Sequence, residues 1–550
     1  MSTHEPITHL PTHDVTNQPP ALEDYNLFDG DPALREALER EGGAWASDAC
    51  RALGADLGTA QTFAWGHDAN RFPPELRTFD RWGQRIDEVE FHPTYHQLMD
   101  LAMRHRVATL PWIERRVGST PAQVALGYMF TQVEAGVLCP ITMTYAVVPA
   151  LQHEAAVAEE WTPRILASAY DPRCIPASQK RGVTFGMAMT EKQGGSDVRA
   201  NTTRARPIGD DAFLLTGHKW FCSAPMSDAF LTLAQTDRGL TCFLVPRFRP
   251  DGTRNNFFIQ RLKNKLGNRS NASSEIEYVD TWARIVGEEG RGVRTIIDMV
   301  HHTRLGAAMA PAGMMRQAVA QAVHHCRHRS AFGKRLVEQP LMRNVLADLA
   351  LEVEAGVVLC MRVARAFDEA EHDEQAARFS RLATAVAKYW LNKRCPGHIY
   401  EALECHGGAG YIEESILPRL YREAPLNSIW EGSGNVICLD VLRAMGRDPA
   451  VVEAVLAEVE PAARDDRHIA SALDRVRGEL RDIEQIEARA RRFTEGLAKL
   501  LQAALLRRYA PQPIADAFVV GRLAQDAGSA YGTLPPGVDL DLLIERARVE

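Results

Sequence analysis

A block of short β-type runs stands between two long helical stretches, and this order restricts the architecture more than any other property of the chain. The runs FLLTGHKWFCSA, DAFLTLAQT and LTCFLVPRF are separated by Gly, Asp and Pro, and the pattern extends from about residue 183 to about residue 287. Before the block, DPALREALERE opens on an Asp in N-cap position and TPAQVALGYMFTQVEAG opens on Thr-Pro, as helices commonly do. The sequence therefore predicts a mainly α protein with a central β domain.

The helices after the block carry regular apolar faces. Met315, Val319, Ala322 and Cys326 recur at helical spacing, and a second stripe runs from 346 to 367, which predicts a four-helix bundle. From residue 469 to residue 500 one apolar stripe continues for about nine turns, which predicts a single long helix. We expect a flexible arm (1–30), an α-helical domain (31–182), a β domain (183–290), a four-helix bundle (291–447) and an added helical unit (448–550).

Charge and cysteine content exclude several classes of protein. The net charge of −8 over 550 residues means that any surface for nucleic acid must be a local patch. The ten cysteines form no Cys-x-x-Cys pair, which argues against a zinc site or a disulfide framework, so we predict no metal. The amino terminus lacks the pattern of a signal peptide, and no stretch has the length to cross a bilayer, so we expect a cytoplasmic protein without a membrane partner.

Three glycine-rich stretches are candidates for binding phosphates. GGAGY (407–411) follows a predicted helix, and GEEGRG (287–292) lacks the Gly-x-Gly-x-x-Gly spacing, so neither fits a dinucleotide-binding fold. GMAMTEKQGGSDVRANTT (186–203) concentrates hydroxyls and open backbone amides, which suit a phosphate or the polar edge of a heterocycle. A simple turn explains this stretch equally well when it is taken alone.

Taken together, six motifs resemble the acyl-CoA dehydrogenase family in order and spacing: GMAMTEKQGGSD, TGHKWFCSA, GEEGRG, RSAFGKRL, HGGAGY and IWEGSGN. LCPITMTYA, TEKQGGSDV, KLGNRSNAS and NSIWEGSGN further resemble the AidB branch, the flavoproteins of the adaptive response to DNA alkylation. The resemblance covers roughly residues 60 to 447. It implies an acyl-CoA dehydrogenase-like fold, with an N-terminal α domain, a middle β-barrel or sandwich and a C-terminal four-helix bundle, and FAD between the last two.

The resemblance also implies which residues hold FAD. The matching positions are Met187, Met189, Thr190, Gly195 and Ser196 for the flavin and pyrophosphate, Trp220, Phe221 and Ser223 for one side of the ring, and Trp430, Gly432, Ser433 and Asn435 beside the base. An apolar, aromatic wall with hydrogen bonds at the polar edge suits an isoalloxazine. Arg329 and Phe332 match a family pair that reaches the FAD of a neighbouring subunit, which implies a homotetramer built as a dimer of dimers.

Glu431 in NSIWEGSGNVICLD is the candidate catalytic base. WEGS occupies the place of the family's Tyr-Glu-Gly-Thr, whose glutamate removes the α proton of an acyl-CoA thioester. Some relatives carry this base on an earlier helix, but the matching dipeptide here is Thr303-Arg304, which has no carboxylate. For an isolated loop glutamate, an ordinary solvated carboxylate is the alternative. Trp430, Ser433, Cys222 and Glu404 depart from the family pattern and would narrow the range of acyl groups.

The branch resemblance implies binding of double-stranded DNA by the carboxy-terminal unit. Residues 451–550 hold 14 lysines and arginines against 17 aspartates and glutamates, so this unit is not basic as a whole. The candidate DNA-binding residues are Arg443, Arg475, Arg489, Arg491, Arg492 and Lys499, and a solvated, ion-paired helix surface is the alternative.

Three functions stay open from the sequence. The first is α,β-dehydrogenation of a short or branched acyl-CoA, such as isovaleryl-CoA, with weak activity allowed. The second is a DNA-protecting flavoprotein with an inactive or vestigial dehydrogenase site, and the third is oxidation of a small molecule derived from damage.

Overall fold

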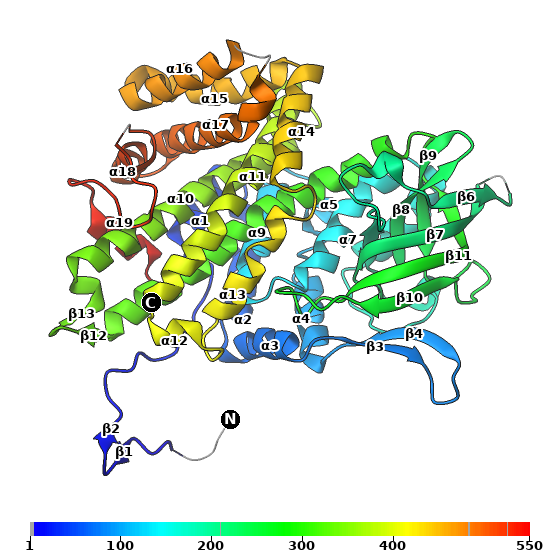
Figure 1. Cartoon of the computed structure of the whole chain (residues 1–550), viewed down its shortest axis with the longest axis horizontal. Coiled ribbons are helices and arrows are strands. Elements are labelled where there is room, and N and C mark those ends of the chain that lie inside the picture. Colours follow the sequence, from blue (N-terminus) through cyan, green and yellow to red (C-terminus); the bar gives the residue numbers. More distant parts are fainter. Residues whose placement is uncertain (1–4, 210, 482–484, 525, 550) are drawn as a thin grey trace.

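The computed structural model describes residues 5–209, 211–481, 485–524 and 526–549. Helices fill the centre of the molecule, a β-barrel lies at one side, and the last helices cover the opposite part of the bundle (Figure 1). This arrangement, with a helical N-terminal part, a middle β part and a helical C-terminal part, is the one predicted from the sequence.

The N-terminal part is helical apart from one hairpin. Its elements are α1 Pro32–Arg40, α2 Ser47–Leu57, α3 Ala60–Arg71, β3 Glu75–Phe79, β4 Arg85–Glu90, α4 Pro93–Arg104, α5 Leu110–Ile113, α6 Ser119–Val133, α7 Leu138–Leu151 and α8 Ala155–Leu166. Asp31 caps α1 as expected, since its side chain accepts a hydrogen bond from the Leu34 amide. The β3–β4 hairpin was not predicted, because its strands are short and largely polar.

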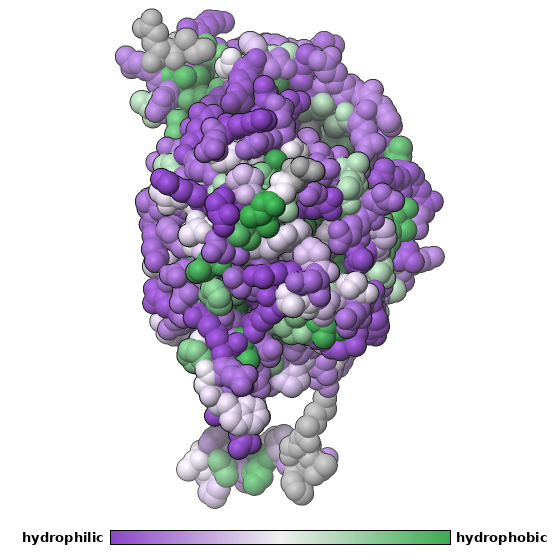
Figure 2. All heavy atoms as spheres, turned by 90° about the vertical axis from the view of Figure 1, so that its right-hand side faces the viewer, coloured by the Kyte–Doolittle hydropathy of each residue, from purple (hydrophilic) through white to green (hydrophobic). Residues whose placement is uncertain are grey.

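The middle part is a closed barrel. It contains β5 Phe185–Ala188, β6 Arg204–Pro207, β7 Ala212–Ser223, β8 Ala229–Thr236, β9 Gly239–Pro246, β10 Phe257–Leu262 and β11 Ser273–Ile285. The strand order is β10-β11-β7-β6-β8-β5, and β9 pairs with both β8 and β11, which closes the ring. The barrel has its own apolar core, which includes Phe230, Phe243 and Tyr278. Its outer end is largely hydrophilic, with apolar residues in small, scattered patches (Figure 2).

Four long helices form the bundle: α9 Gly292–His328, α10 Pro340–Glu369, α11 Glu374–Glu404 and α14 Gly434–Arg447. The two-stranded hairpin of β12 Ser330–Ala331 and β13 Lys334–Arg335 follows α9, and α12 Gly408–Tyr411 and α13 Leu417–Glu423 lie between α11 and α14. The stripes predicted from the sequence are buried, since Met315, Val319 and Leu346 belong to the main core. Helix α9 packs on α6, α7, α10 and α11, so it joins the N-terminal part to the bundle.

The carboxy-terminal part consists of α15 Ala450–Asp465, α16 Arg467–Arg481, α17 Ile486–Tyr509, α18 Gln512–Arg522 and α19 Leu540–Ala547. The prediction of one helix from 469 to 500 is wrong, because α16 and α17 are separate helices that pack on each other. A long apolar stripe needs a partner surface, and here the two halves of the stripe supply it to one another. Ile483, which belongs to that stripe, lies outside the described residues.

Within the described part of the chain, no helix combines the length and the apolar character that spanning a membrane requires.

Candidate functional site

The turn that follows β5 is fastened to the next long strand of the barrel. The Trp220 amide donates a hydrogen bond of 2.8 Å to the carbonyl oxygen of Thr190. Gly195 packs on Thr190 so closely that an added Cβ would lie 2.3 Å from the Thr190 Oγ1 atom, so only glycine fits at this position. Met187 and Met189 lie next to this turn and are half-buried, whereas Ser196 is exposed. The structure therefore brings these predicted cofactor-binding residues together at one edge of the barrel.

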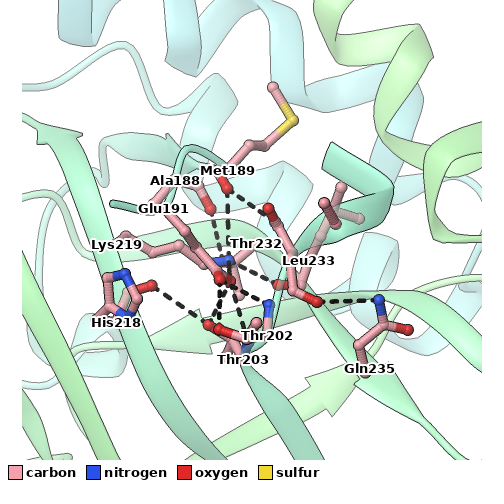
Figure 3. A network of polar contacts seen from close by, with 12 residues as sticks. Ala188, Met189, Glu191, Thr202, Thr203, His218, Lys219, Thr232, Leu233 and Gln235 are labelled. Carbon is pink, nitrogen blue, oxygen red and sulfur yellow. Dashed lines mark hydrogen bonds and ion pairs between the residues drawn. The ribbon is translucent and has the colours of Figure 1, made fainter. Parts of the chain in front are cut away.

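A buried ion pair holds this turn in place (Figure 3). The Lys219 Nζ atom lies 2.9 Å from Glu191 Oε1 and donates a second hydrogen bond of 2.8 Å to the Leu233 carbonyl oxygen. Both side chains are fully buried. Burial alone would raise the pKa of Glu191, but Lys219 and donors from Thr202 and Thr203 bring that pKa well below its ordinary value. Glu191 is therefore a charged structural anchor, and its position directly after Thr190 fixes the course of the turn.

The barrel end near this turn carries an open aromatic surface and a chain of hydroxyls. Phe221 is 50% exposed, and the Lys263 Nζ atom lies 3.3 Å from the centre of the Trp220 ring. Ser223 Oγ lies 3.2 Å from Ser273 Oγ, which is 3.0 Å from the Lys265 Nζ atom. Phe221, Trp220 and the Ser223 hydroxyl therefore bring aromatic surface and a hydrogen-bonding group to the same end of the barrel.

Glu431 lies in the loop between α13 and α14 and has a strained backbone. Its φ of 55° is in the left-handed region, which glutamate rarely adopts. The Arg304 Nε atom donates a hydrogen bond of 3.2 Å to the Glu431 carbonyl oxygen. Arg304 is bound in turn by Asp440 at 3.0 Å, and Arg381 binds the same carboxylate at 2.9 Å. The Thr303-Arg304 dipeptide, the alternative place for a family base, thus lies directly beside Glu431.

The carboxylate of Glu431 is only partly accessible and is not fully bonded. Its Oε2 atom is buried and has no hydrogen-bond partner among the described residues. Burial raises the pKa of Glu431, and Arg304, the Thr303 hydroxyl and Lys388 oppose that rise. This is not the ordinary solvated loop carboxylate that an isolated glutamate suggests. A carboxyl group with a raised pKa and an unused oxygen is equipped to accept a proton.

The remaining predicted residues of this loop lie at the start of α14. The Trp430 Nε1 atom donates a hydrogen bond of 2.7 Å to Asn427 Oδ1, which turns the indole back onto its own loop. Gly432 has a φ of 101°, and an added Cβ would lie 2.9 Å from Ile437 Cδ1. Ser433 and Asn435 are exposed on the first turn of α14. The first turn of this helix therefore presents open polar groups, which suits an anion.

Cys139 of α7 connects the barrel to the base. Burial raises the pKa of the Cys139 thiol to about 11, and the groups that act on it include Lys265, Ser223 and Glu431. These contacts place the barrel end, α7 and the base loop around one region. The side chains there offer apolar and aromatic surface together with hydroxyl donors, so the residues present fit FAD.

Arg329 and Phe332 do not join this site within one chain. They lie on the hairpin at the far end of α9, away from the barrel (Figure 1). Phe332 is 99% exposed, and the Arg329 Nη1 atom donates a hydrogen bond of 2.6 Å to the carbonyl oxygen of Asn17 in the N-terminal arm. The Asn17 side chain also makes reciprocal bonds of 2.9 and 2.8 Å with the backbone of Ser330. The arm is thus attached to the hairpin.

The six predicted DNA-binding residues differ in their surroundings. Arg489 and Arg492 share the Glu479 carboxylate at 2.6 and 3.0 Å, and Lys499 lies 2.5 Å from Glu495. Arg475 on α16 donates a hydrogen bond of 3.2 Å to the Leu523 carbonyl oxygen. Arg443 on α14 and Arg491 on α17 are exposed. The ion-paired surface suggested as the alternative therefore describes Arg489, Arg492 and Lys499 well.

Sequence reasoning missed Lys388, Cys139 and Lys265. Lys388 is the clearest case, because it is a lysine within the apolar run LATAVAKYWL, where a charged side chain on a buried helix face signals a specific partner. Cys139 and Lys265 lie in LCPITMTYA and KLGNRSNAS, which were used only to recognise the branch.

Comparisons with known proteins agree with this architecture. Residues 17–172 match the adaptive response protein AidB N-terminal domain, residues 186–281 the acyl-CoA dehydrogenase middle domain and residues 290–446 the acyl-CoA dehydrogenase C-terminal domain. The chain is 46% identical to the putative acyl-CoA dehydrogenase AidB of Escherichia coli over 93% of its own length and 94% of that protein.

Two solved structures illustrate the likeness in fold. Caenorhabditis elegans ACDH-11 in complex with C11-CoA has a TM-score of 0.83 and 27% identity, over 98% of this chain and 95% of that one. An acyl-CoA dehydrogenase from Bacillus anthracis complexed with FAD has a TM-score of 0.63 and 16% identity, over 78% of this chain and 79% of that one.

Proposed function

We propose, from the premise that this chain belongs to the acyl-CoA dehydrogenase family and to its AidB branch, that it oxidises a short or branched acyl-CoA at its α and β carbons with Glu431 as the base. The chain is an FAD-dependent oxidoreductase of the acyl-CoA dehydrogenase type. The choice of an acyl group of the isovaleryl class, the assembly and any DNA partner belong to the proposal.

The observation that carries the proposal is the buried, unpartnered Oε2 atom of Glu431. When bound, FAD supplies a hydride acceptor at N5 of its ring. Glu431 would take the proton from the α carbon while the hydride leaves the β carbon. The Arg304 hydrogen bond to the Glu431 carbonyl oxygen restrains the backbone that carries the base.

The direct test is anaerobic addition of isovaleryl-CoA to the purified holoprotein while the flavin absorbance is followed. We expect bleaching in the natural protein and its loss in Glu431→Gln, with FAD still bound. Glu371→Gln, in the exposed connection between α10 and α11, is the matched control and should bleach normally. Bleaching that survives in Glu431→Gln would overturn the assignment of the base.

In this proposal Arg329 and Phe332 reach the FAD of a neighbouring subunit, so the protein assembles as a homotetramer. A side chain that is 99% exposed at the tip of a hairpin gains most from burial against a second copy of the chain. Sedimentation should give a tetramer for the natural protein and a smaller species for Phe332→Asp. A Phe332→Asp tetramer that retains FAD would contradict this role.

A second function, binding of double-stranded DNA in the response to alkylation, is favoured by exposed Arg443 and Arg491. Binding of a labelled duplex should weaken linearly in log affinity with log salt concentration, and Arg443→Glu with Arg491→Glu should lower both affinity and slope. The matched control is Arg77→Glu with Arg104→Glu, the same change of charge at two exposed arginines of the N-terminal part. An unchanged slope in the double variant would exclude this surface.

If no thioester of a panel bleaches the flavin while the duplex binds, a DNA-protecting flavoprotein with a vestigial dehydrogenase site becomes the better description.

A further inference from the structure

Lys388 is a buried lysine of α11 that binds the loop carrying Glu431. Its side chain is 1% exposed, and its Nζ atom donates hydrogen bonds of 3.0 Å to the Asn427 carbonyl oxygen and 2.8 Å to the Gly432 carbonyl oxygen. These two carbonyls lie before and after Glu431 in the chain. In the described part of the chain, no carboxylate lies within ion-pair distance of Lys388.

A buried ammonium group that binds only neutral carbonyls is costly, so its position requires an explanation. The same loop holds Glu431 at a φ of 55°, a conformation that persists only where the surroundings enforce it. Lys388 binds the loop on both sides of Glu431, through the Asn427 and Gly432 carbonyl oxygens. Arg304 donates a hydrogen bond of 3.2 Å to the Glu431 carbonyl oxygen between them. Lys388 and Arg304 together thus bind three carbonyl oxygens of the strained turn.

The two cations are not equivalent. Arg304 is compensated by Asp440 at 3.0 Å, and that carboxylate also receives Arg381. Lys388 has no such counter-charge among the described residues, and Glu431 is the acid that acts on it. The other charged or titratable groups nearby are Lys393 on α11 and His301 on α9. Lys388 therefore adds to the positive charge of the Arg304, Arg381 and Asp440 group near the Glu431 carboxylate.

We infer that Lys388 is a positioning residue for the base: it fixes the strained turn around Glu431 and, together with Arg304, adds positive charge that favours the ionised carboxylate. The inference rests on the proposed function, because a base must be deprotonated to accept the α proton. Burial lowers the pKa of Lys388 to about 7, while Glu431 opposes that fall. Each group therefore favours the charged form of the other.

The expected effect has a definite sign. Loss of the ammonium leaves Glu431 with burial and without this charge, so the pKa of Glu431 should rise further. In Lys388→Met, the acidic limb of the rate of flavin reduction should move to higher pH by about one unit. Lys388→Arg keeps the charge and should leave the limb nearly in place, whereas Lys388→Gln keeps a hydrogen-bond donor without charge and should move the limb as Lys388→Met does.

A second readout does not depend on turnover. Infrared difference spectra of the holoprotein, recorded between pH 5 and pH 9, should contain a carboxyl band that is missing in Glu431→Gln. This band should persist to higher pH in Lys388→Met than in the natural protein. Arg378→Gln removes a charge from the solvent side of the same helix, where Arg378 binds Asp448 at 2.9 Å, and should leave the titration unchanged.

The outcomes distinguish the positioning role of Lys388 from the proposed dehydrogenation. An identical titration midpoint in the natural protein, Lys388→Met and Lys388→Gln would overturn the positioning role, even if all three variants bleach with isovaleryl-CoA. A shifted midpoint in a protein that bleaches with no thioester would support the role of Lys388 and reject the proposed reaction. If Lys388→Met does not fold, Lys388→Gln and Lys388→Arg decide the matter.

Discussion

A glutamate and a lysine in the barrel and another glutamate and lysine in the bundle are built in opposite ways. Glu191 and Lys219 lie 2.9 Å apart, and Thr202, Thr203 and the Leu233 carbonyl complete their hydrogen bonds. Glu431 retains an unpartnered oxygen among the described residues, and Lys388 binds backbone carbonyls instead of a carboxylate.

The difference distinguishes a pair that stabilises the fold from a pair suited to proton transfer. A pair whose hydrogen bonds are complete is locked in its charged state and serves to fix a fold. A pair held apart by the backbone leaves the carboxylate able to accept a proton, which costs stability and permits catalysis. The barrel pair supports the turn that we propose holds FAD, and the bundle pair includes the proposed base.

The largest effect should come from breaking the barrel pair. Lys219→Met leaves Glu191 buried without its counter-ion and should lower the free energy of unfolding by about 3–5 kcal/mol. Chemical denaturation of the holoprotein measures this loss, and FAD should be released more readily as the turn relaxes. The double variant Glu191→Gln with Lys219→Met is the matched control and should lose much less. Equal losses in both would mean that the charges contribute little.

The bundle pair should be visible in the pH dependence of stability. The pKa of Lys388 is lowered to about 7 in the folded state, so between pH 7 and pH 10 the unfolded chain binds more protons at this residue. This lysine therefore makes stability rise with pH across that window, by about 1 kcal/mol per pH unit. Lys388→Met should remove that rise in urea titrations. A slope unchanged by the substitution would show that Lys388 is charged throughout.

Neutralising Glu431 should change the free energy of unfolding less than Lys219→Met does, and in the opposite direction. The raised pKa of Glu431 means that folding disfavours its charged form, and this contribution destabilises the protein once the pH exceeds the ordinary glutamate pKa. Glu431→Gln should therefore be more stable at pH 8 than the natural protein, by about 1 kcal/mol. A drop in the thermal midpoint would instead assign Glu431 a structural role like that of Glu191.

The smallest effect should come from an exposed pair in the N-terminal part. Arg104 and Asp100 lie 2.8 Å apart on α4, and both side chains are more than half exposed. Arg104→Gln should change the free energy of unfolding by less than about 1 kcal/mol, because solvent screens the pair. A loss as large as that of Lys219→Met would mean that distance, and not burial, determines the contribution.

Sequence patterns predicted the two loops better than they predicted the side chains that hold those loops in place. TEKQGGSD and WEGS mark the cofactor turn and the base because both are continuous in the chain. Lys388 could not be connected to Glu431 from sequence, since its carbonyl partners lie 39 and 44 residues away and any residue type can supply a carbonyl. The boundary between α16 and α17 was missed for a related reason: an apolar stripe has the same period whether the helix continues or folds back.

The length of helix α9 determines how many copies of the chain contribute to each site in the proposed tetramer. Arg304 lies in the first half of this helix, which runs from Gly292 to His328, and Arg329 follows its last residue, so at 1.5 Å per residue these two arginines are about 38 Å apart along the helix. Under the proposed tetramer, each catalytic centre would combine the Arg304 end of one copy with the Arg329 end of another. Hybrids mixed from an Arg329 variant and a Glu431 variant should then regain part of the activity that either homogeneous assembly lacks.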